Sequence, residues 1–338
     1  MKRTLGLAII LTLAGAVGTR YGFHMLLERS VSVDHVPLRV DVLAGESFRT
    51  TAEKLEAGGL IPSALAITLW ARWRGIDRQI QQGAYWFREP LSPISLVEKM
   101  RSGEATVIRV TLPEGLTARE VAMILERQGL GTESEYLELI RDPAFARSLG
   151  VLADSLEGYL FPDTYLFSPL DRAGKVLRML VERFHGIFDS AMTAKAEASG
   201  LTLHQVVTLA SLIEKETARA EERPIVAAVF RNRLRKNMPL QADPTVIYGI
   251  EHFNGNLTRH DLETPSPYNT YTVAGLPPGP IANPGRASLI AALNPADVDY
   301  LYFVARDDGS HEFNRNLSDH NRAVNRYQRH RRVSGETG

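Results

Sequence analysis

The sequence of 338 residues contains no cysteine, which excludes disulfide bonds, iron–sulfur clusters, cysteine-ligated zinc and thiol nucleophiles together. It carries no net charge, because 39 Lys and Arg residues balance 39 Asp and Glu residues, so a nucleic-acid partner is not expected. Phosphate-binding glycine loops, dinucleotide fingerprints and paired-histidine zinc motifs are missing from the sequence as well, so we expect no cofactor and no metal. The chemistry that remains is acid–base catalysis by a carboxylate.

A long apolar run is present at the N-terminus. Lys2 and Arg3 precede a mostly apolar, uncharged stretch at residues 4–19. The stretch is shorter than the roughly 20 residues of an ordinary spanning helix, but tilt or local thinning of the bilayer can accommodate a short helix. We interpret residues 1–28 as a cytoplasmic tip and an uncleaved transmembrane signal anchor. A signal peptide cleaved near the small residues 14–16 is the alternative. The positive charges predict a cytoplasmic N-terminus, with the rest of the chain outside the cytoplasmic membrane.

A strand-like segment followed by a helical one occurs twice. The first copy covers residues 38–60, and a second follows 70 positions later, at residues 108–130. In the second copy, Thr117 and Glu120 have the spacing of a capping box, which predicts the start of a helix. The constant spacing indicates an internal repeat, although any two strand–glycine–helix units would look similar.

The overall pattern predicts an α+β fold. Between the two copies, helical segments flank an aromatic strand, so residues 36–108 are expected to form a compact α+β module. Helical periodicity dominates from residue 171 to about 237, and a hairpin is predicted over 300–313. Residues 238–284 are polar, aromatic and rich in proline, which is typical of binding loops. We therefore expect a second, mainly helical domain over 109–338, with a small β-hairpin and long binding loops.

The strongest chemical signal is an apolar helical run that ends in two carboxylates, Glu214 and Glu216. Residues two positions apart on a helix point in nearly opposite directions, so one carboxylate at most shares the apolar face. Leucine or isoleucine precedes Glu216 by three, four and seven positions, which puts Glu216 on that face. Burial and the negative end of the helix dipole both raise a carboxyl pKa, as a general acid requires. A buried salt bridge with Arg231 or Arg233 is the alternative.

Six segments resemble one family closely: residues 155–165, 210–217, 229–234, 240–249, 268–271 and 275–281. They are similar to the YceG-like (MltG) family of endolytic murein transglycosylases, and the resemblance covers nearly the whole chain beyond the N-terminal run. It implies an inner-membrane anchor, a LysM-like module at residues 36–108 and a catalytic domain at 109–338. It also implies one catalytic glutamate, which we assign to Glu216, with Glu214 as the alternative.

The substrate implied by the resemblance is peptidoglycan, at the β-1,4 bond between N-acetylmuramic acid and N-acetylglucosamine. Cleavage would leave a 1,6-anhydromuramoyl end, act on nascent strands and limit their length, and peptidoglycan synthases (penicillin-binding proteins) are expected partners. Seven residues are predicted to bind the glycan or hold the acid: Gln241, Asp243, Tyr268, Asn269, Thr270, Glu157 and Tyr159. His311 and His320 are weaker site candidates.

Two other functions remain open. A hydrolase of the same bond would use Glu216 as acid and a second carboxylate, Asp243 or Glu157, as base. A membrane-tethered scaffold that binds glycan without cleaving it would use the LysM-like module alone.

Overall fold

The computed structural model describes residues 21–22, 25–30, 38–87 and 90–329. It divides into two compact units. The first contains the described residues up to Arg109 together with Leu166–Asp171, and the second contains Val110–Tyr165 and the described residues from Arg172 onward. Both units combine helices with short strands, so the α+β prediction is confirmed.

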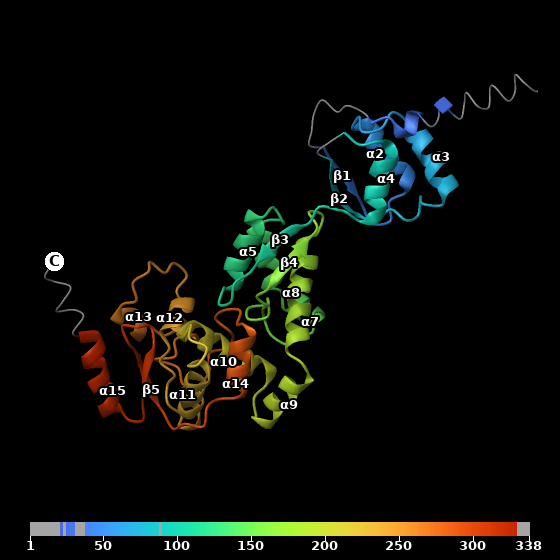
Figure 1. The fold of residues 1–338 in the computed structure, drawn as a ribbon. Helices are drawn as coiled ribbons and strands as arrows, with labels where there is room; N and C mark the ends of the chain where they lie inside the picture. Colours follow the sequence, from blue (N-terminus) through green and yellow to red (C-terminus); the bar gives the residue numbers. More distant parts are fainter. Residues whose placement is uncertain (1–20, 23–24, 31–37, 88–89, 330–338) are drawn as a thin grey trace, which may run out of the picture. The chain divides into compact units, whose positions relative to one another are not determined.

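The first unit is a β-α-α-β-α arrangement (Figure 1). Strand β1 (Leu38–Val42) pairs antiparallel with β2 (Gly83–Phe87), with α2 (Phe48–Ala57) and α3 (Ala64–Arg74) between them in the chain and α4 (Pro93–Ser102) after them. All three helices begin after a serine whose hydroxyl accepts a backbone N–H of the first turn, which satisfies a donor that the helix itself leaves free.

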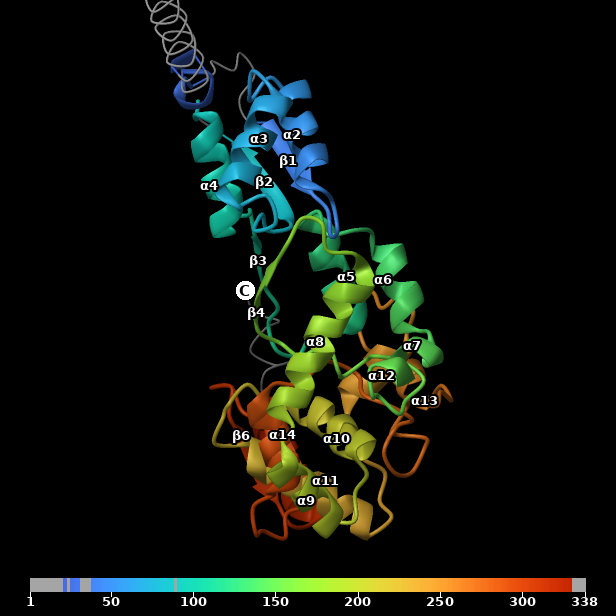
Figure 2. The same ribbon diagram turned by 90° about the vertical axis from the view of Figure 1, so that its right-hand side faces the viewer.

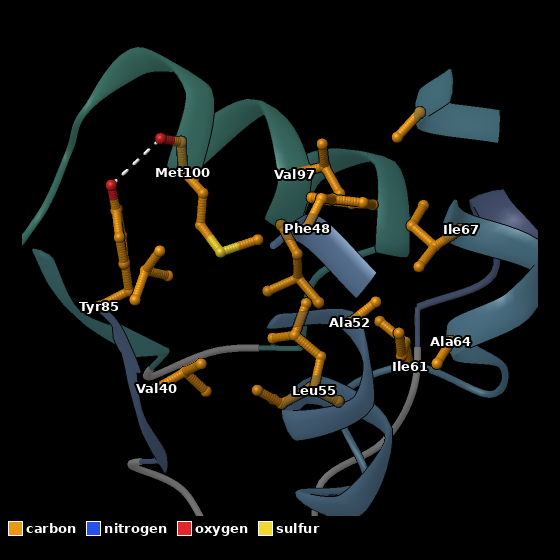
Figure 3. Close-up of a cluster of buried hydrophobic side chains, with 14 of the residues drawn as sticks. Val40, Phe48, Ala52, Leu55, Ile61, Ala64, Ile67, Tyr85, Val97 and Met100 are labelled. Carbon is orange, nitrogen blue, oxygen red and sulfur yellow. Dashed lines mark hydrogen bonds between the residues drawn. The ribbon is translucent and has the colours of Figure 1, made fainter. Parts of the chain in front are cut away.

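Apolar side chains from every element of this unit meet in one core (Figure 3). Phe48, Ala52 and Leu55 lie on α2 at the spacing of one helical face. The Tyr85 hydroxyl donates to the Met100 carbonyl at 3.1 Å, so the polar end of this buried ring is satisfied. The unit therefore has a hydrophobic core of its own.

The described residues do not test the predicted signal anchor. No helix among them is long and apolar enough to cross a bilayer. The apolar run predicted to form the signal anchor, residues 4–19, lies outside the described residues.

The two copies of the sequence repeat share an element order. Strand β3 (Ile108–Thr111) and helix α5 (Ala118–Arg127) stand at the second copy, and β3 pairs with β4 (Thr164–Phe167). Between α5 and β4 the chain forms α6 (Glu133–Ile140) and α7 (Pro143–Ser148). The predicted capping box of α5 is present with both of its hydrogen bonds. The division between the two units falls within β3 and β4.

Helix α10 (Leu203–Glu216) is the centre of the second unit. It contacts α9 (Ser190–Ala198), α11 (Arg223–Arg235), α12 (Asp243–Gly249) and α14 (Arg286–Leu293), and α10, α11 and α14 lie side by side in Figure 2. Every residue from Val206 to Ile213 is buried. The middle of α10 is therefore covered on all sides and has no solvent-facing stripe, whereas Gln205 and Lys215 nearer its ends are exposed.

The remaining elements are α8 (Ala173–Ile187), α13 (Arg259–Glu263), the antiparallel hairpin of β5 (Tyr302–Ala305) and β6 (His311–Asn314), α15 (Leu317–Val324) and a π-helical turn, η1 (Asn325–Arg329). The hairpin was predicted. The helical region from residue 171 to 199 is two helices, because Asp189 caps α9, and the predicted loop region 238–284 contains α12 and α13.

Gly158 is expected to tolerate no side chain. Its φ is +88°, and a Cβ there would lie 2.5 Å from Pro280 and 2.8 Å from Val207. We expect Gly158→Ala to lower the free energy of unfolding by about 2–4 kcal/mol, from overpacking together with left-handed backbone strain. Gly255 is the matched control, since its φ is +90° and nothing lies within 4 Å of the added Cβ. Equal losses in urea denaturation of the two variants would contradict the overpacking contribution.

Candidate active site

Glu216 is the last residue of α10, and Thr217 after it is extended. The end of the helix turns the carboxyl group toward a cavity of about 450 Å³. The cavity wall is built from α11, α12, the β5–β6 hairpin and α15, which contribute Arg233, Asp243, Phe303, His311 and His320. A helix end therefore presents one carboxyl group to a space that can receive a ligand.

The charge state of Glu216 is set by burial and two neighbours. Burial, together with the negative charge of Asp243, raises the pKa of Glu216 to about 8, against an opposing contribution from the positive charge of Arg233. At neutral pH the carboxyl group therefore carries its proton. The alternative predicted from the sequence, a buried salt bridge, does not describe this residue, because Arg233 directs its hydrogen bonds elsewhere.

Glu214 occupies a different environment. Its carboxylate accepts a hydrogen bond from the Arg223 guanidinium at 3.2 Å and one from the Gly285 backbone N–H at 2.9 Å. The side chain is only 6% exposed, although helical phase predicted burial of Glu216 alone. That inference was wrong because α11 and the start of α14 cover Glu214 as well. Glu214 ties α10 to α11 and to the start of α14.

Gln241 and Asp243 line the cavity beside Glu216. Gln241 has a φ of +52°, a conformation that costs free energy in a residue other than glycine and often marks a functional site. Its side-chain oxygen accepts from Arg233 at 3.1 Å, and its backbone N–H donates to the Thr270 carbonyl at 3.0 Å. The Asp243 carboxylate accepts from the Tyr271 hydroxyl at 2.5 Å. The two predicted residues thus reach the cavity on a turn that other side chains hold in place.

Thr270 and Asn269 support this turn from behind. The buried Thr270 hydroxyl accepts the Ala242 N–H at 3.0 Å and lies 2.8 Å from the Thr245 hydroxyl. The buried Asn269 amide donates to three backbone carbonyls at residues 261, 262 and 264. These two side chains hold the loop that carries Gln241, and neither is among the residues that line the cavity.

Glu157, Tyr159 and Tyr268 lie elsewhere. Glu157 lines a separate cavity of about 530 Å³, where it accepts hydrogen bonds from the Ala118 N–H and the Tyr248 hydroxyl. Burial raises the pKa of Glu157 to about 7. The Tyr268 ring lies against that of Tyr248 at 4.8 Å, and the Tyr159 hydroxyl is hydrogen-bonded to His204 at 2.9 Å. The structure does not bring these three side chains to the Glu216 cavity.

Arg233 and Tyr271 also line the cavity, although neither was predicted to bind the substrate. Arg233 is buried, and its guanidinium donates to the backbone carbonyls of Leu301, Pro239 and Leu240 at 2.6–3.0 Å. Tyr271 lies on the wall next to Asp243. Both residues belong to segments that the family resemblance singled out. The hydrogen bond from Arg233 to the Leu301 carbonyl joins positions 68 residues apart, which no local pattern reveals.

Both weakly indicated histidines line the cavity. The His320 ring stacks on Tyr302 with centroids 5.2 Å apart. Burial and the nearby Arg233 charge lower the pKa of His320, so this ring is neutral at pH 7. His311 is hydrogen-bonded to Glu222. Nowhere in the described part of the chain do three or more His, Asp or Glu side chains gather in a metal-binding cluster.

Comparison with known proteins shows which family the chain belongs to. Residues 40–326 match the YceG-like family. The chain belongs to this family. An endolytic murein transglycosylase of Bacillus subtilis (strain 168) is 30% identical over 318 residues, which cover 89% of this chain and 88% of that protein.

Other members of the YceG-like family are similar over most of the chain. An endolytic murein transglycosylase of Streptococcus pneumoniae serotype 2 is 27% identical over 347 residues, with 91% of this chain and 62% of that protein covered. The crystal structure of a yceG-like protein from Listeria monocytogenes superposes with a TM-score of 0.59 at 30% identity, covering 85% of this chain and 99% of that one. The YceG-like relationship therefore includes both described units.

Proposed function

We propose that this protein is an endolytic murein transglycosylase with Glu216 as its catalytic acid. The observation that carries the assignment is the Glu216 carboxyl group at the wall of a cavity, where burial and the Asp243 charge keep it protonated at neutral pH. The relatives that match most of the chain bear the same name as this activity. Glu214, two residues away, is the alternative acid, but its carboxylate already binds Arg223 and the Gly285 backbone N–H.

The reaction begins with proton transfer. Glu216 donates its proton to the glycosidic oxygen between N-acetylmuramic acid and N-acetylglucosamine, and positive charge develops on the muramyl C1. The muramyl C6 hydroxyl attacks C1 and loses its proton, which closes the 1,6-anhydro ring. Water is not consumed. Gln241, Asp243 and Tyr271 are placed on the wall where they can bind sugar hydroxyls.

The mass of the products tests this proposal. An anhydro end is lighter by one water than the reducing end that a hydrolase leaves. Hydrolysis needs a second carboxylate as base or nucleophile, and Asp243 lines the Glu216 cavity whereas Glu157 lines another. We expect mass spectrometry of glycan strands digested by the purified protein to find anhydro ends. Reducing ends alone would refute the transglycosylase and favour a hydrolase that uses Asp243.

The cellular setting is part of the proposal. Residues 1–28 serve as a single-pass anchor in the inner membrane, and the rest of the chain lies outside the cytoplasmic membrane. The β-α-α-β-α unit is a LysM-like module that holds glycan, and the enzyme cleaves nascent strands beside peptidoglycan synthases. The order of elements in the first unit supports the LysM-like part of this proposal. To test this part of the proposal, residues 36–108 are purified alone, and we expect them to sediment with insoluble peptidoglycan.

A further inference from the structure

His311 and Glu222 form a closely coupled pair on the cavity wall. The His311 Nδ1 and a Glu222 carboxylate oxygen are 2.6 Å apart, and the His311 backbone N–H donates to the other oxygen at 2.8 Å. The two side chains are 10% and 8% exposed. Glu222 stands at the start of α11 and His311 at the start of β6, 89 positions apart. Two contacts to one carboxylate fix both the backbone and the ring of His311.

The partner of Nδ1 determines which ring nitrogen carries the proton. Burial raises the pKa of Glu222, but the hydrogen bonds from His311 and Thr217 outweigh it, so the pKa is lowered overall and the carboxylate is charged. A charged carboxylate accepts only, so the tautomer of the neutral imidazole that fits this contact carries its proton on Nδ1. The unprotonated nitrogen is then Nε2, on the opposite side of the imidazole.

Nε2 is available to a ligand. His311 lines the cavity that contains Glu216, and among the described residues its ring hydrogen bond is the one made by Nδ1 to Glu222. Thr217 connects the two parts of the site, because it follows Glu216 directly and its hydroxyl donates to Glu222 at 3.0 Å. A proton donor and a proton acceptor are thus present together before any substrate binds.

We propose that His311 is a second catalytic residue, the base that accepts the proton of the muramyl C6 hydroxyl, with Glu222 as its positioning residue. This inference rests on the proposed function. The C6 oxygen forms its bond to C1 as its proton passes to His311 Nε2, the bond from C1 to the leaving oxygen breaks, and that oxygen takes the proton of Glu216. The charged Glu222 stabilises the imidazolium that results, as a carboxylate does beside other catalytic histidines.

The proton balance closes within the site. After one turnover Glu216 is a carboxylate and His311 an imidazolium, and return of one proton from His311 to Glu216 through solvent restores both. Besides Glu222, the charged or titratable groups around His311 on the same cavity are Glu216, Arg233, Asp243, Tyr271 and His320. Removal of Nε2 must therefore slow the chemical step more than it weakens glycan binding.

His311→Asn is the principal test, because the Asn amide can still donate to Glu222 while no group replaces Nε2. We expect the rate at saturating glycan to fall about 10²- to 10⁴-fold, the range for loss of a general base, with little change in the glycan concentration at half-maximal rate. His185→Asn is the control, since His185 lies on α8 and its Nε2 is hydrogen-bonded to the Leu149 carbonyl instead of a carboxylate. A near wild-type rate for His311→Asn would overturn the proposal.

Chemical rescue separates catalysis from structure. In His311→Ala, added imidazole can occupy the space of the lost ring, and we expect it to restore part of the rate without stimulating the wild type. An unrescued His311→Ala that is folded by circular dichroism would count against a base. Different results would refute the transglycosylase function and the role of His311. Absence of anhydro ends from the wild-type products refutes the proposed function, whereas anhydro ends formed by His311→Asn at the wild-type rate refute only the role of His311.

Discussion

Replacement of Glu216 by Gln is expected to reduce the rate of anhydro-end formation by about 10²- to 10⁴-fold, the contribution of a general acid. Gln has the shape of Glu but no acidic proton to give to the leaving oxygen. The wild-type carboxyl group holds that proton at neutral pH because burial and Asp243 raise its pKa to about 8. We therefore also expect the wild-type rate to decline as pH rises through about 8. Rates of purified variants on isolated glycan strands measure both effects.

Glu214→Gln is the matched control for the Glu216 variant. It makes the same chemical change two residues away, where the carboxylate binds Arg223 at 3.2 Å. Loss of a buried ion pair lowers stability, so we expect a less stable protein with nearly normal activity per folded molecule. If Glu216→Gln is as active as the wild type and Glu214→Gln is inactive, the acid is Glu214. If Glu216→Gln abolishes cleavage in the purified assay but leaves function in cells intact, a non-catalytic glycan-binding scaffold is favoured.

Stability measurements test the raised pKa of Glu216 independently of activity. The folded-state pKa of about 8 lies above the ordinary value of 4.5, so the folded wild type holds an extra proton between these pH values. Its free energy of unfolding must then decrease as pH rises through that window. Gln does not titrate and avoids this loss. Glu216→Gln should become more stable relative to the wild type as pH rises from 5 to 8, and a constant difference in urea denaturation would contradict the raised pKa.

Local sequence signals predicted much of this structure because the determinants lie within a few residues. The helical segments predicted within residues 36–108 are present as α2, α3 and α4, and each begins after a serine cap. The capping box at Thr117 was found by its spacing alone. The position of Glu216 at the end of its helix follows from the same short-range pattern. Missed elements, such as α12 and α13, lie in a proline-rich stretch where local propensity favours loops.

The rest of the site depends on contacts between residues that are far apart in the sequence. His311 and Glu222 meet across 89 positions, and Arg233 binds the Leu301 carbonyl across 68. Neither pairing has a spacing rule. The burial of residues 206–213 of α10 likewise comes from four other helices, and helical phase alone could not show that α11 and the start of α14 also cover Glu214. Short-range pattern thus predicted the acid, whereas the opposing effects of Asp243 and Arg233 on its pKa became visible only in the fold.

Replacement of Arg233 by Met is expected to lower the free energy of unfolding and to change the pKa of Glu216. The guanidinium donates to the carbonyls of Leu301, Pro239 and Leu240, and it lies over the Tyr302 ring at 5.0 Å. Met fills much of the space but donates nothing. Since a buried carbonyl left without its donor costs about 1–3 kcal/mol, we expect a loss of about 3–5 kcal/mol in the free energy of unfolding, as for other broken buried charge networks.

The effect of Arg233→Met on Glu216 can be measured separately. The positive charge of Arg233 lowers the pKa of Glu216, so its removal must raise that pKa and move the decline of the rate to higher pH. Arg233→Lys keeps the charge but loses the planar fork of donors, so it should restore the position of the decline without restoring full stability. Arg235→Met, an exposed site on the same helix, is the control. A pH profile that Arg233→Met leaves unmoved would show that Arg233 only holds the loop and does not set the charge of the acid.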